Sequence, residues 1–402
     1  MFSARLWNSD GSMGNSTSGH RSWRGDPVGK TVVFKRNEPP GITYRIPALI
    51  YISEKQTFLA FAEKRTSSCD HDAKLLVMRR GTLDNTTIEW LPIQDLKTAC
   101  LPEHRTMNPC PVFEKNTQSL FLFFICVLKK TTEHHQICTG KNRARLCYVT
   151  SSDYGQSWSD VKDLTESVIG KSIRKWATFA VGPGHGIQTK SGRLIIPAYV
   201  FYIHHKCFCY PLPCSVQPYA LSFYSDDCGK TWQVGTRMQM KSCECEMAEV
   251  MDHEGRSYLY CNARNTSGHR VEAISEDNGV DFTRAHLARN LVEQPHGCQG
   301  SVVAFKVPTY VSEVSGEGMW LLYTHPTDRR KRRDLGVYLN RSPLRTSKWE
   351  EPWIIHQGPS GYTDLAYCED KDVFACLMEC GEESELEEIA CCLFDLRNIM
   401  ET

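Results

Sequence analysis

A turn-forming octet recurs along this chain and places the strongest constraint on its fold. Residues 151–158 read SSDYGQSW and residues 225–232 read SDDCGKTW, so both follow the pattern Ser-x-Asp-x-Gly-x-Ser/Thr-Trp. A third copy at 275–282 is degenerate, because Asp281 and Phe282 fill its last two places. In such a turn the aspartate bonds the turn's own amides, glycine supplies a positive φ, and the aromatic ring packs back between strands. A hairpin recurring at irregular spacing predicts the blades of a β-propeller, with insertions between blades.

Strand-length apolar segments fill most of the remaining sequence. They are rich in aromatic and β-branched residues, as at 58–61, 75–78, 194–197 and 320–323. Helical periodicity is weak, and one short helix is expected at 160–169. The sequence therefore predicts an all-β fold. We expect residues 1–38, rich in Ser, Gly, Asn and Arg, to form a mobile tail, and residues 39–402 to form a single propeller domain.

Composition excludes several classes of protein. Lys+Arg and Asp+Glu both number 47, a formal net charge of +0, so no nucleic-acid partner is predicted. The 19 cysteines are typical of reduced thiols in a cytosol-facing protein rather than of a disulfide scaffold. Residues 1–22 lack the apolar region of a secretory signal. The longest apolar run, 120–128, is far shorter than the roughly 20 residues of a membrane span, and it predicts a buried strand.

The pentapeptide 44–48, Tyr-Arg-Ile-Pro-Ala, lies early in this β-rich sequence. Arg45 presents a rigid fork of donors suited to a carboxylate, and Pro47 restricts the residue before it to an extended conformation. Taken alone, an arginine beside a proline is most often a surface residue. Its position ahead of the octets changes this interpretation, because Tyr-Arg-Ile-Pro followed by Asp-box octets resembles the sialidase (neuraminidase) superfamily.

The resemblance covers residues 40–395 and is closest to the vertebrate intracellular and membrane-associated enzymes. The phrases that carry it include those at 41–49, 61–65, 104–111 and 176–186. It implies a six-bladed β-propeller with Asp-box hairpins and a retaining exo-α-sialidase that needs no cofactor and no metal. The implied substrates are glycoconjugates with terminal sialic acid, above all sialylated glycolipids (gangliosides), with glycoproteins and oligosaccharides as further substrates.

The family binds the carboxylate of sialic acid with three arginines from separate blades. By motif, these correspond to Arg45, to Arg264 at the end of Tyr-Cys-Asn-Ala-Arg, and to Arg332 ahead of Asp-Leu-Gly. The third position lies in the basic run 329–333, where Arg333 is the alternative.

The resemblance also assigns the catalytic groups. Tyr362 would be the nucleophile, because attack at a carboxylate-bearing anomeric centre disfavours an anionic carboxylate. A phenol has a pKa of about 10 and needs a base beside it. Glu244 would be that base, with Glu246 as the alternative on the same strand face, whereas Glu249 is expected at a solvent-facing edge. Asp70, in a polar loop, would be the general acid and then the general base.

Five further contacts around the sugar are implied by the resemblance: Arg65, Asn108, Glu133, Tyr199 and Gln299. The first two would face the hydroxyl and N-acyl side of the ring, and Tyr199 would meet the glycerol tail. Relatives often carry a second tyrosine two places after Tyr199, where this chain has Phe201. One hydroxyl contact is then missing or shifted. Gln299 equally fits the role of an amide that orders a loop.

Two segments are candidates for peripheral contact with a membrane. The loop at 201–214 holds aromatic residues, two histidines and three cysteines, whose spacing does not match a zinc finger. We expect its rings to touch a membrane and its cysteines to be acylated. The basic run 329–333 would attract anionic lipid. The expected location is therefore the plasma membrane or another cellular membrane, with the cytosol as the alternative.

Two other functions fit part of the pattern. A non-catalytic sialoglycan-binding propeller needs the arginines but has no use for Asp70, Glu244 and Tyr362 together. A Kelch-like interaction propeller leaves the three arginines unexplained. The hydrolase is therefore the favoured hypothesis.

Overall fold

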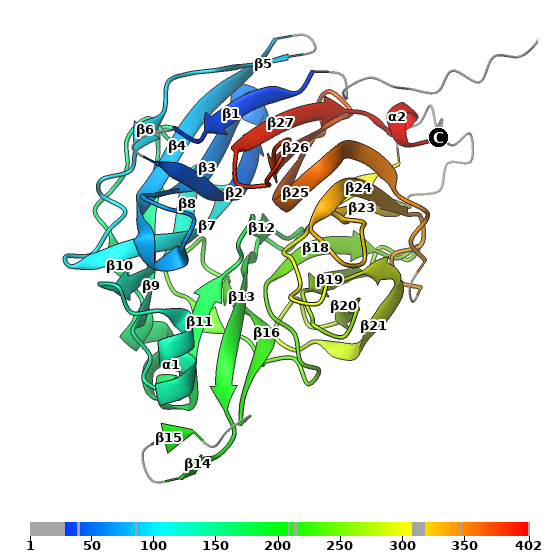
Figure 1. The fold of residues 1–402 in the computed structure, drawn as a ribbon. Helices are drawn as coiled ribbons and strands as arrows, with labels where there is room; N and C mark the ends of the chain where they lie inside the picture. Colours follow the sequence, from blue (N-terminus) through cyan, green and yellow to red (C-terminus); the bar gives the residue numbers. More distant parts are fainter. Residues whose placement is uncertain are drawn as a thin grey trace, which may run out of the picture.

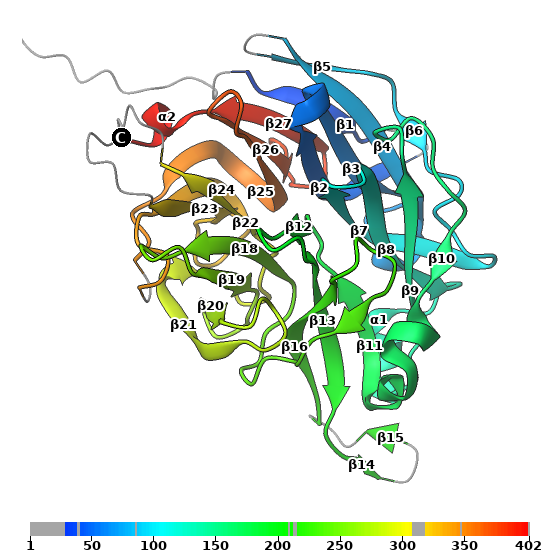
Figure 2. The ribbon, with the colours of Figure 1, turned by 180° about the vertical axis from the view of Figure 1, so that it is seen from behind.

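The computed structural model describes residues 29–37, 41–84, 87–207, 210–211, 215–307, 318–345 and 348–400. In this part of the chain, antiparallel sheets are arranged around a common centre as in a propeller (Figure 1, Figure 2). The predicted all-β fold is confirmed. Among the described residues, no helix has the length and apolar character needed to cross a membrane.

The first three sheets follow one another along the chain. The first contains β2 (Thr43–Ile52), β3 (Thr57–Arg65), β4 (Ala73–Asp84), β5 (Thr87–Trp90) and β6 (Gln94–Asp95), with the short turns η1 (Ser53–Lys55) and η2 (Asp70–Asp72). The second contains β7 (His104–Glu114), β8 (Ser119–Leu128), β9 (Ala144–Ser151) and β10 (Lys162–Asp163), with helix α1 (Glu133–Thr139) between β8 and β9. The third contains β11 (Trp176–Val181), β12 (Ile187–Gln188), β13 (Leu194–Ile203), β16 (Val216–Ser225) and β17 (Gln233–Val234).

The remaining strands form a four-stranded sheet, a small hairpin and one large sheet. The four-stranded sheet contains β18 (Cys245–Met251), β19 (Ser257–Ala263), β20 (His269–Ser275) and β21 (Thr283–Val292). The hairpin pairs β14 (Lys206–Cys207) with β15 (Tyr210–Pro211). The seven-stranded sheet contains β22 (Ser301–Lys306), β23 (Met319–Pro326), β24 (Arg333–Asn340), β25 (Trp353–Cys368), β26 (Val373–Cys380), β27 (Glu388–Phe394) and β1 (Thr31–Lys35), and helix α2 (Leu396–Met400) follows β27.

Strand β25 divides the large sheet into two groups. Its first half pairs with β24 as far as Pro359, and its second half, from Ser360, pairs with β26. One group of strands therefore contains β22, β23, β24 and the first half of β25. The other group contains the second half of β25, β26, β27 and β1.

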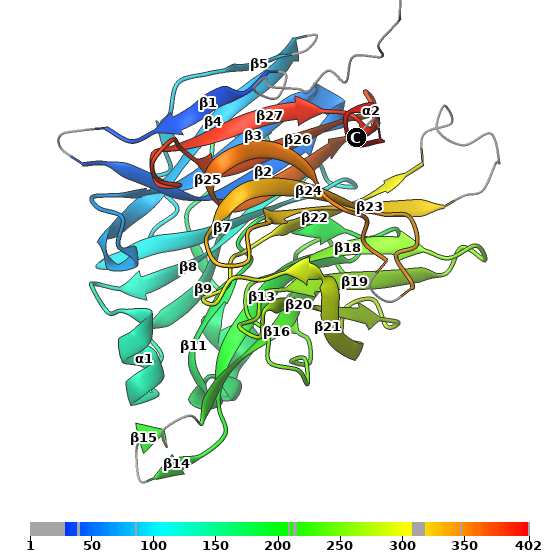
Figure 3. The same ribbon diagram turned by 45° about the vertical axis from the view of Figure 1, so that its right-hand side comes forward.

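The N-terminal boundary expected from the sequence is wrong. Thr31–Lys35 forms β1, which pairs with β27 near the C-terminus (Figure 3), so the sheets begin before residue 39. The hydrogen bonds of β1 to a strand more than 350 residues away close the ring of sheets. Residues 1–28 of the predicted tail lie outside the described residues.

The turn octets link each sheet to the one before it. Asp153 accepts hydrogen bonds from the backbone of Gln156 and Ser157 at 3.0 and 2.9 Å. Gly229 has φ +83° and lies against Phe121 of the second sheet, where a Cβ atom would come within 2.3 Å of the ring. Trp232 packs on the same sheet, with its ring centroid 4.6 Å from that of Phe123. The octet thus contacts the neighbouring sheet in two ways: its aromatic ring packs on that sheet, and the backbone at its glycine lies close to a side chain of that sheet.

Two local expectations differ in outcome. The apolar run 120–128 is the buried strand β8, as predicted. The helix expected at 160–169 is wrong in its first half, where β10 pairs with β9. Its second half is a π-helical turn, η3 (Thr165–Ile169), which continues into a 3-10 turn, η4 (Gly170–Lys175).

Candidate active site

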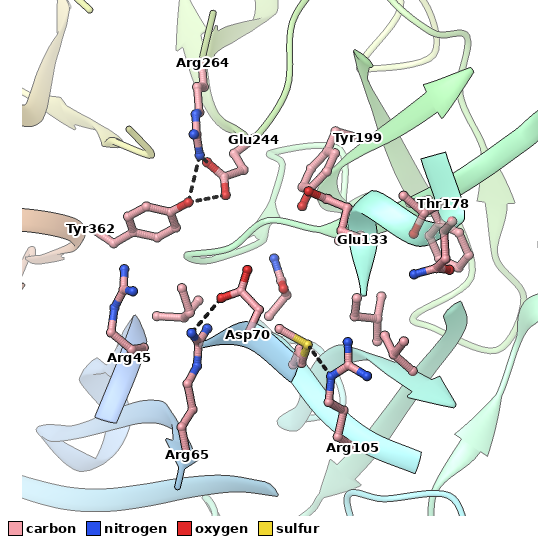
Figure 4. A pocket seen from close by; sticks show the side chains of 18 of the residues that line it. Arg45, Arg65, Asp70, Arg105, Glu133, Thr178, Tyr199, Glu244, Arg264 and Tyr362 are labelled. Carbon is pink, nitrogen blue, oxygen red and sulfur yellow. Dashed lines mark hydrogen bonds and ion pairs between the residues drawn. The ribbon is translucent and has the colours of Figure 1, made fainter. Parts of the chain in front are cut away.

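A polar pocket of about 260 Å³ lies among the inner strands of several sheets (Figure 4). Ten of the eleven predicted site residues line it: Arg45, Arg65, Asp70, Asn108, Glu133, Tyr199, Glu244, Arg264, Arg332 and Tyr362. They come from strands, loops and helix α1, distributed over several sheets. The fold therefore collects residues that are up to 317 positions apart in the sequence into one cavity.

Three inner strands carry a β-bulge where they reach the pocket. The register shifts between Arg45 and Ala48 in β2, between Met107 and Cys110 in β7, and around Tyr362 in β25. Ile46 has φ +60°, so it does not take the extended conformation expected before Pro47, and Asn108 has φ +58°. A β-branched residue rarely adopts such a backbone, and strain of this kind gathers at functional sites. Each bulge turns a pocket side chain away from the regular alternation of its strand.

Two buried glutamates satisfy the amides that these bulges release. Glu379 accepts from the backbone N of Ile46 at 2.8 Å and of Tyr362 at 3.0 Å. Glu63 accepts from the backbone N of Asn108 at 2.8 Å. The same carboxylates hold the pocket arginines. Arg45 donates to Glu379 at 2.7 and 3.1 Å, and Arg65 donates to Glu63 at 2.6 and 2.9 Å.

Burial opposes ionisation of Glu379, but the charge and hydrogen bonds of Arg45 hold the pKa of this carboxyl below its ordinary value. Glu379 therefore remains charged, and it fixes both the bulge of β25 that presents Tyr362 and the guanidinium group of Arg45. Arg45 Nη1 donates no hydrogen bond to any described residue, which leaves that nitrogen for a ligand.

Tyr362, Glu244 and Arg264 form a closed hydrogen-bonded triangle (Figure 4). The Tyr362 hydroxyl donates to Glu244 at 2.5 Å, and Arg264 Nη1 donates to Glu244 at 2.6 Å and to the Tyr362 oxygen at 2.8 Å. Burial, followed by the charge of Glu244, raises the pKa of Tyr362 well above its ordinary value, while Arg264 and Arg332 act in the opposite direction. The phenol is thus neutral at rest, with a proton acceptor in contact.

The three predicted clamp arginines converge on Tyr362. The guanidinium carbons of Arg45 and Arg332 lie 5.7 and 5.3 Å from the centre of its ring, and Arg264 bonds its hydroxyl. Arg332 Nη2 donates to the carbonyl of Gly297 at 2.8 Å, which fixes its orientation. Arg333, the alternative, is exposed and pairs with Asp334 at 3.4 Å. The pocket therefore contains Arg332 and not Arg333.

Asp70 lies at the open side of the pocket in the short turn η2. Its side chain is 70 % exposed, and it accepts a hydrogen bond from Arg65 Nη1 at 2.6 Å, while Arg65 itself is 1 % exposed. A carboxyl group held by a buried arginine and open to water is placed to exchange protons with solvent and with a ligand.

The remaining predicted contacts line the opposite wall. Asn108 donates from its side chain to the carbonyl of Val181 at 3.3 Å, and Tyr199 is buried beside Glu133. Desolvation by the surrounding protein, followed by the charges of Glu244 and Asp70, raises the pKa of Glu133 to about 7. Glu133 is nevertheless exposed by surface area, so water in the pocket moderates this shift. Phe201 stacks edge-on against Tyr199 and does not line the pocket.

Gln299 is the predicted site residue that the structure places elsewhere. It is 1 % exposed and lies beneath the pocket, where it donates to Glu246 at 3.1 Å and to the carbonyl of Thr363 at 2.9 Å. Its role is to order the inner strands. Glu246, the alternative base, faces the same buried network, 3.6 Å from His185 and bonded to Ser301 at 2.7 Å. It has no access to the pocket.

Sequence reasoning missed the residues that hold others in place. Glu379 and Glu63 support the arginines, and Arg105 lines the pocket while donating to the carbonyls of Lys129 and Thr131 at 2.5 and 2.7 Å. A signal existed for Arg105, which lies in one of the family-like phrases. None existed for Glu379, because its partner Arg45 is 334 positions away.

Comparisons with known proteins show which proteins this chain resembles. A family model described as BNR repeat-like domain matches residues 56–375. Sialidase-3 of Homo sapiens is 50% identical over 396 residues, covering 92% of each chain, and Sialidase-3 of Bos taurus is 49% identical over 397 residues, covering 92% of this chain and 93% of that protein. Sialidase-2 of Mus musculus is 44% identical over 367 residues, covering 89% and 94%.

Solved structures share the fold at low sequence identity. The intramolecular trans-sialidase from Ruminococcus gnavus in complex with oseltamivir carboxylate has a TM-score of 0.71 and 14% identity, covering 92% of this chain and 98% of that chain. Trypanosoma rangeli sialidase in complex with 2,3-difluorosialic acid, a covalent intermediate, has a TM-score of 0.64 and 17% identity, covering 92% and 59%. At these identities the structures support the propeller alone. The identity and coverage of the curated relatives establish that this chain belongs to the sialidase family and is an exo-α-sialidase, a glycoside hydrolase.

Proposed function

We propose that this chain is a retaining exo-α-sialidase in which Tyr362 is the nucleophile. The observation that carries the proposal is the triangle of Tyr362, Glu244 and Arg264, with a carboxylate 2.5 Å from the phenol hydroxyl. A weak nucleophile needs such a base in contact with it. The guanidinium groups of Arg45, Arg264 and Arg332 match the carboxylate that sialic acid carries on its anomeric carbon.

In the first step, the substrate carboxylate binds between the three arginines. Tyr362 Oη forms a bond to the anomeric carbon while its proton passes to Glu244. The glycosidic bond breaks, and its oxygen takes a proton from Asp70, so the aglycone leaves as an alcohol. Because burial raises the pKa of Tyr362, the proton leaves during the attack and not before it.

In the second step, Asp70 takes a proton from water as the water oxygen attacks the anomeric carbon. The bond to Tyr362 breaks, and the phenol recovers its proton from Glu244. Two inversions give net retention. The exposure of Asp70 suits this exchange, because the aglycone departs and water enters on the open side of the pocket.

We propose gangliosides as the preferred substrates and peripheral membrane attachment as the location. The exposed basic residues of the run 329–333 support contact with an anionic surface. The cysteines at 207, 209 and 214 fall where the side chains lie outside the described residues. A ganglioside in vesicles should be cleaved with a higher kcat/KM than a soluble sialoside, and equal values would contradict the preference. Release of the protein from membranes by a high-salt wash tests the basic run, and thiol-specific release of acyl groups tests the cysteines.

We further infer six blades with Asp-box turns. The pairing of the two halves of β25 with different strands supports counting the large sheet as two blades. The backbone hydrogen bonds accepted by Asp153, Asp227 and Asp277 support assigning the octets as Asp-boxes.

The stereochemistry of the first product tests the mechanism. Proton NMR during hydrolysis of a fluorogenic sialoside should detect the α anomer of sialic acid before mutarotation. Initial release of the β anomer would contradict a covalent intermediate. Absence of turnover at any pH from about 3 to about 8 would instead favour a non-catalytic sialoglycan-binding propeller.

A further inference from the structure

A second cavity lies on the other side of β13 from the catalytic pocket. Tyr199 lines the catalytic pocket, whereas its neighbour Val200 points to the opposite face of the strand and lines the second cavity together with Tyr202. The second cavity has a volume of about 570 Å³. We call it the basic pocket and define it by Lys171, Lys175, Trp176, Tyr202, Leu221 and Arg237. The strands β11, β13 and β16 that form its wall are labelled in Figure 1.

The lining of the basic pocket carries four cationic residues and no acidic one. Lys171, Arg174 and Lys175 come from the turn η4, and Arg237 follows β17. No carboxylate among the described residues lies within ion-pair distance of Lys171, Lys175 or Arg237. The like charges of these three residues repel one another, and an anion that enters relieves this cost.

Arg237 is held in place by aromatic rings. Its guanidinium carbon lies 4.6 Å from the ring centre of Tyr202 and 4.4 Å from that of Tyr219. The Tyr219 hydroxyl is bonded to His204 Nε2 at 2.8 Å, which fixes the ring. Stacking orients a guanidinium group without neutralising it, so the full charge and the N–H edges remain available.

The apolar side chains of the other walls distinguish this cavity from an exposed basic surface and make it suitable for binding a ligand. Trp176 is 6 % exposed and Leu221 is 2 % exposed, so they form an apolar floor beneath the charges. An anion above this floor meets the cations on a surface of low dielectric constant, where their attraction is stronger than in water.

We propose that the basic pocket binds a compact, multiply charged oxyanion of the phosphate-ester class. A phosphate ester offers several oxygens and up to two charges, which suits the fork of Arg237 and the point charges of the lysines. The single carboxylate of one sialic acid would leave most of this charge unmatched. The phosphate ester can be a soluble metabolite or the headgroup of a phospholipid, and both sources share this chemistry.

Binding to the full-length chain tests the proposal. Isothermal titration with inositol 1,4,5-trisphosphate supplies the soluble phosphate ester. Sedimentation with phosphatidylcholine vesicles, with and without phosphatidylinositol 4,5-bisphosphate, supplies the lipid headgroup. We expect saturable binding in at least one arm. The exposed pair Lys171→Gln with Lys175→Gln should weaken it about tenfold, and Arg237→Gln should weaken it by a similar factor.

The matched control is Lys97→Gln with Lys115→Gln, which removes the same charge from exposed positions outside both pockets and outside the run 329–333. It should leave binding within about twofold, and all three variants should hydrolyse a soluble fluorogenic sialoside as the wild type does. Binding in the titration arm alone identifies a soluble phosphate ester, and binding to vesicles alone identifies a lipid headgroup. Absence of saturable binding in both arms, or equal weakening by the control, would overturn the proposal.

Discussion

The two faces of β13 hold two positively charged pockets whose charges are compensated differently. In the catalytic pocket, Arg45, Arg65 and Arg264 are each paired with a buried glutamate. In the basic pocket, Lys171 and Arg237 have no such partner among the described residues, and Arg237 is held by stacking alone. An ion pair with glutamate orients the guanidinium group and lowers the net charge of the pocket. Stacking on an aromatic ring orients the guanidinium group and leaves its charge uncompensated.

This difference suits the two pockets to different tasks. Paired arginines hold one carboxylate in one orientation, which a reaction at the adjacent carbon requires. Unpaired cations attract any anion of sufficient charge and bind it through their summed field. Substitutions in the catalytic pocket should therefore change turnover steeply, and those in the basic pocket should change binding and leave turnover unaltered.

The largest effect is expected from Glu244→Gln. The amide cannot accept the Tyr362 proton, so kcat should fall by a factor of about 10² to 10⁴ with a small change in KM. Steady-state hydrolysis of a fluorogenic sialoside measures both constants. Glu249→Gln is the matched control, because Glu249 accepts from Ser257 and Lys190 outside the pocket and should leave kcat unchanged. A Glu244 variant with wild-type kcat would remove this residue from the reaction.

Arg332→Ala and Arg333→Ala, at adjacent positions, should differ strongly in their effect on kcat/KM. Arg332 lies over the Tyr362 ring in the pocket, and Arg333 is exposed. Loss of Arg332 should cost about 2 kcal/mol or more of transition-state binding, a fall of about thirtyfold in kcat/KM. Loss of Arg333 should change kcat/KM by less than about twofold. The reverse order would show that the clamp uses the alternative arginine.

Arg105→Lys should weaken substrate binding through α1. Arg105 holds the carbonyls of Lys129 and Thr131 just before that helix, which presents Glu133 to the pocket. Lysine makes fewer of these bonds, so KM should rise about fivefold while kcat changes little.

The control for Arg105 is Arg79→Lys. Arg79 likewise donates to backbone carbonyls, in its case the three of Val33, Trp90 and Leu91, but it lies outside the pocket. Both variants should lower the free energy of unfolding by about 1–2 kcal/mol, measured by urea denaturation. An equal rise in KM for both would mean that the effect of Arg105 is general loss of stability.

The smallest effect concerns pH. Burial raises the pKa of Glu133 toward about 7, and because water in the pocket moderates this shift, the carboxyl loses its proton between its ordinary 4.5 and that value. Its contribution to stability is therefore greatest at low pH and is lost as pH rises through 7. Ionised Glu133 also repels a substrate carboxylate, so the KM of the wild type should rise about threefold between about pH 6 and about pH 8. In Glu133→Gln, KM should stay flat, and an unchanged rise would assign the titration to another group.

Some site residues could be predicted from the sequence because each lies in a short sequence motif. Arg45, Arg264 and Tyr362 were found in this way, and the octets with glycine and aspartate predicted the hairpins. Gln299 could not be placed from the sequence, because it lies in the loop before β22 and a loop sequence does not say against which strands a side chain packs.

The supporting residues could not be predicted, because their partners are distant in sequence. Glu379 caps amides released by bulges in β2 and β25, and a bulge has no reliable signature in a single sequence. Strand β1 was assigned to the tail although Thr31–Lys35 reads Thr-Val-Val-Phe-Lys, a strand-like run. Its partner β27 lies at the other end of the chain, so the sequence around residues 31–35 does not show which strand they pair with.

Covalent trapping of Tyr362 tests the central claim most directly. The chain is incubated with 2,3-difluorosialic acid, digested and mapped by mass spectrometry, with Tyr362→Phe in parallel. We expect one added sialyl group on the peptide that contains Tyr362, located on that tyrosine by fragmentation, and no adduct in the variant. An adduct on Glu244, on Asp70 or on any other residue would contradict it.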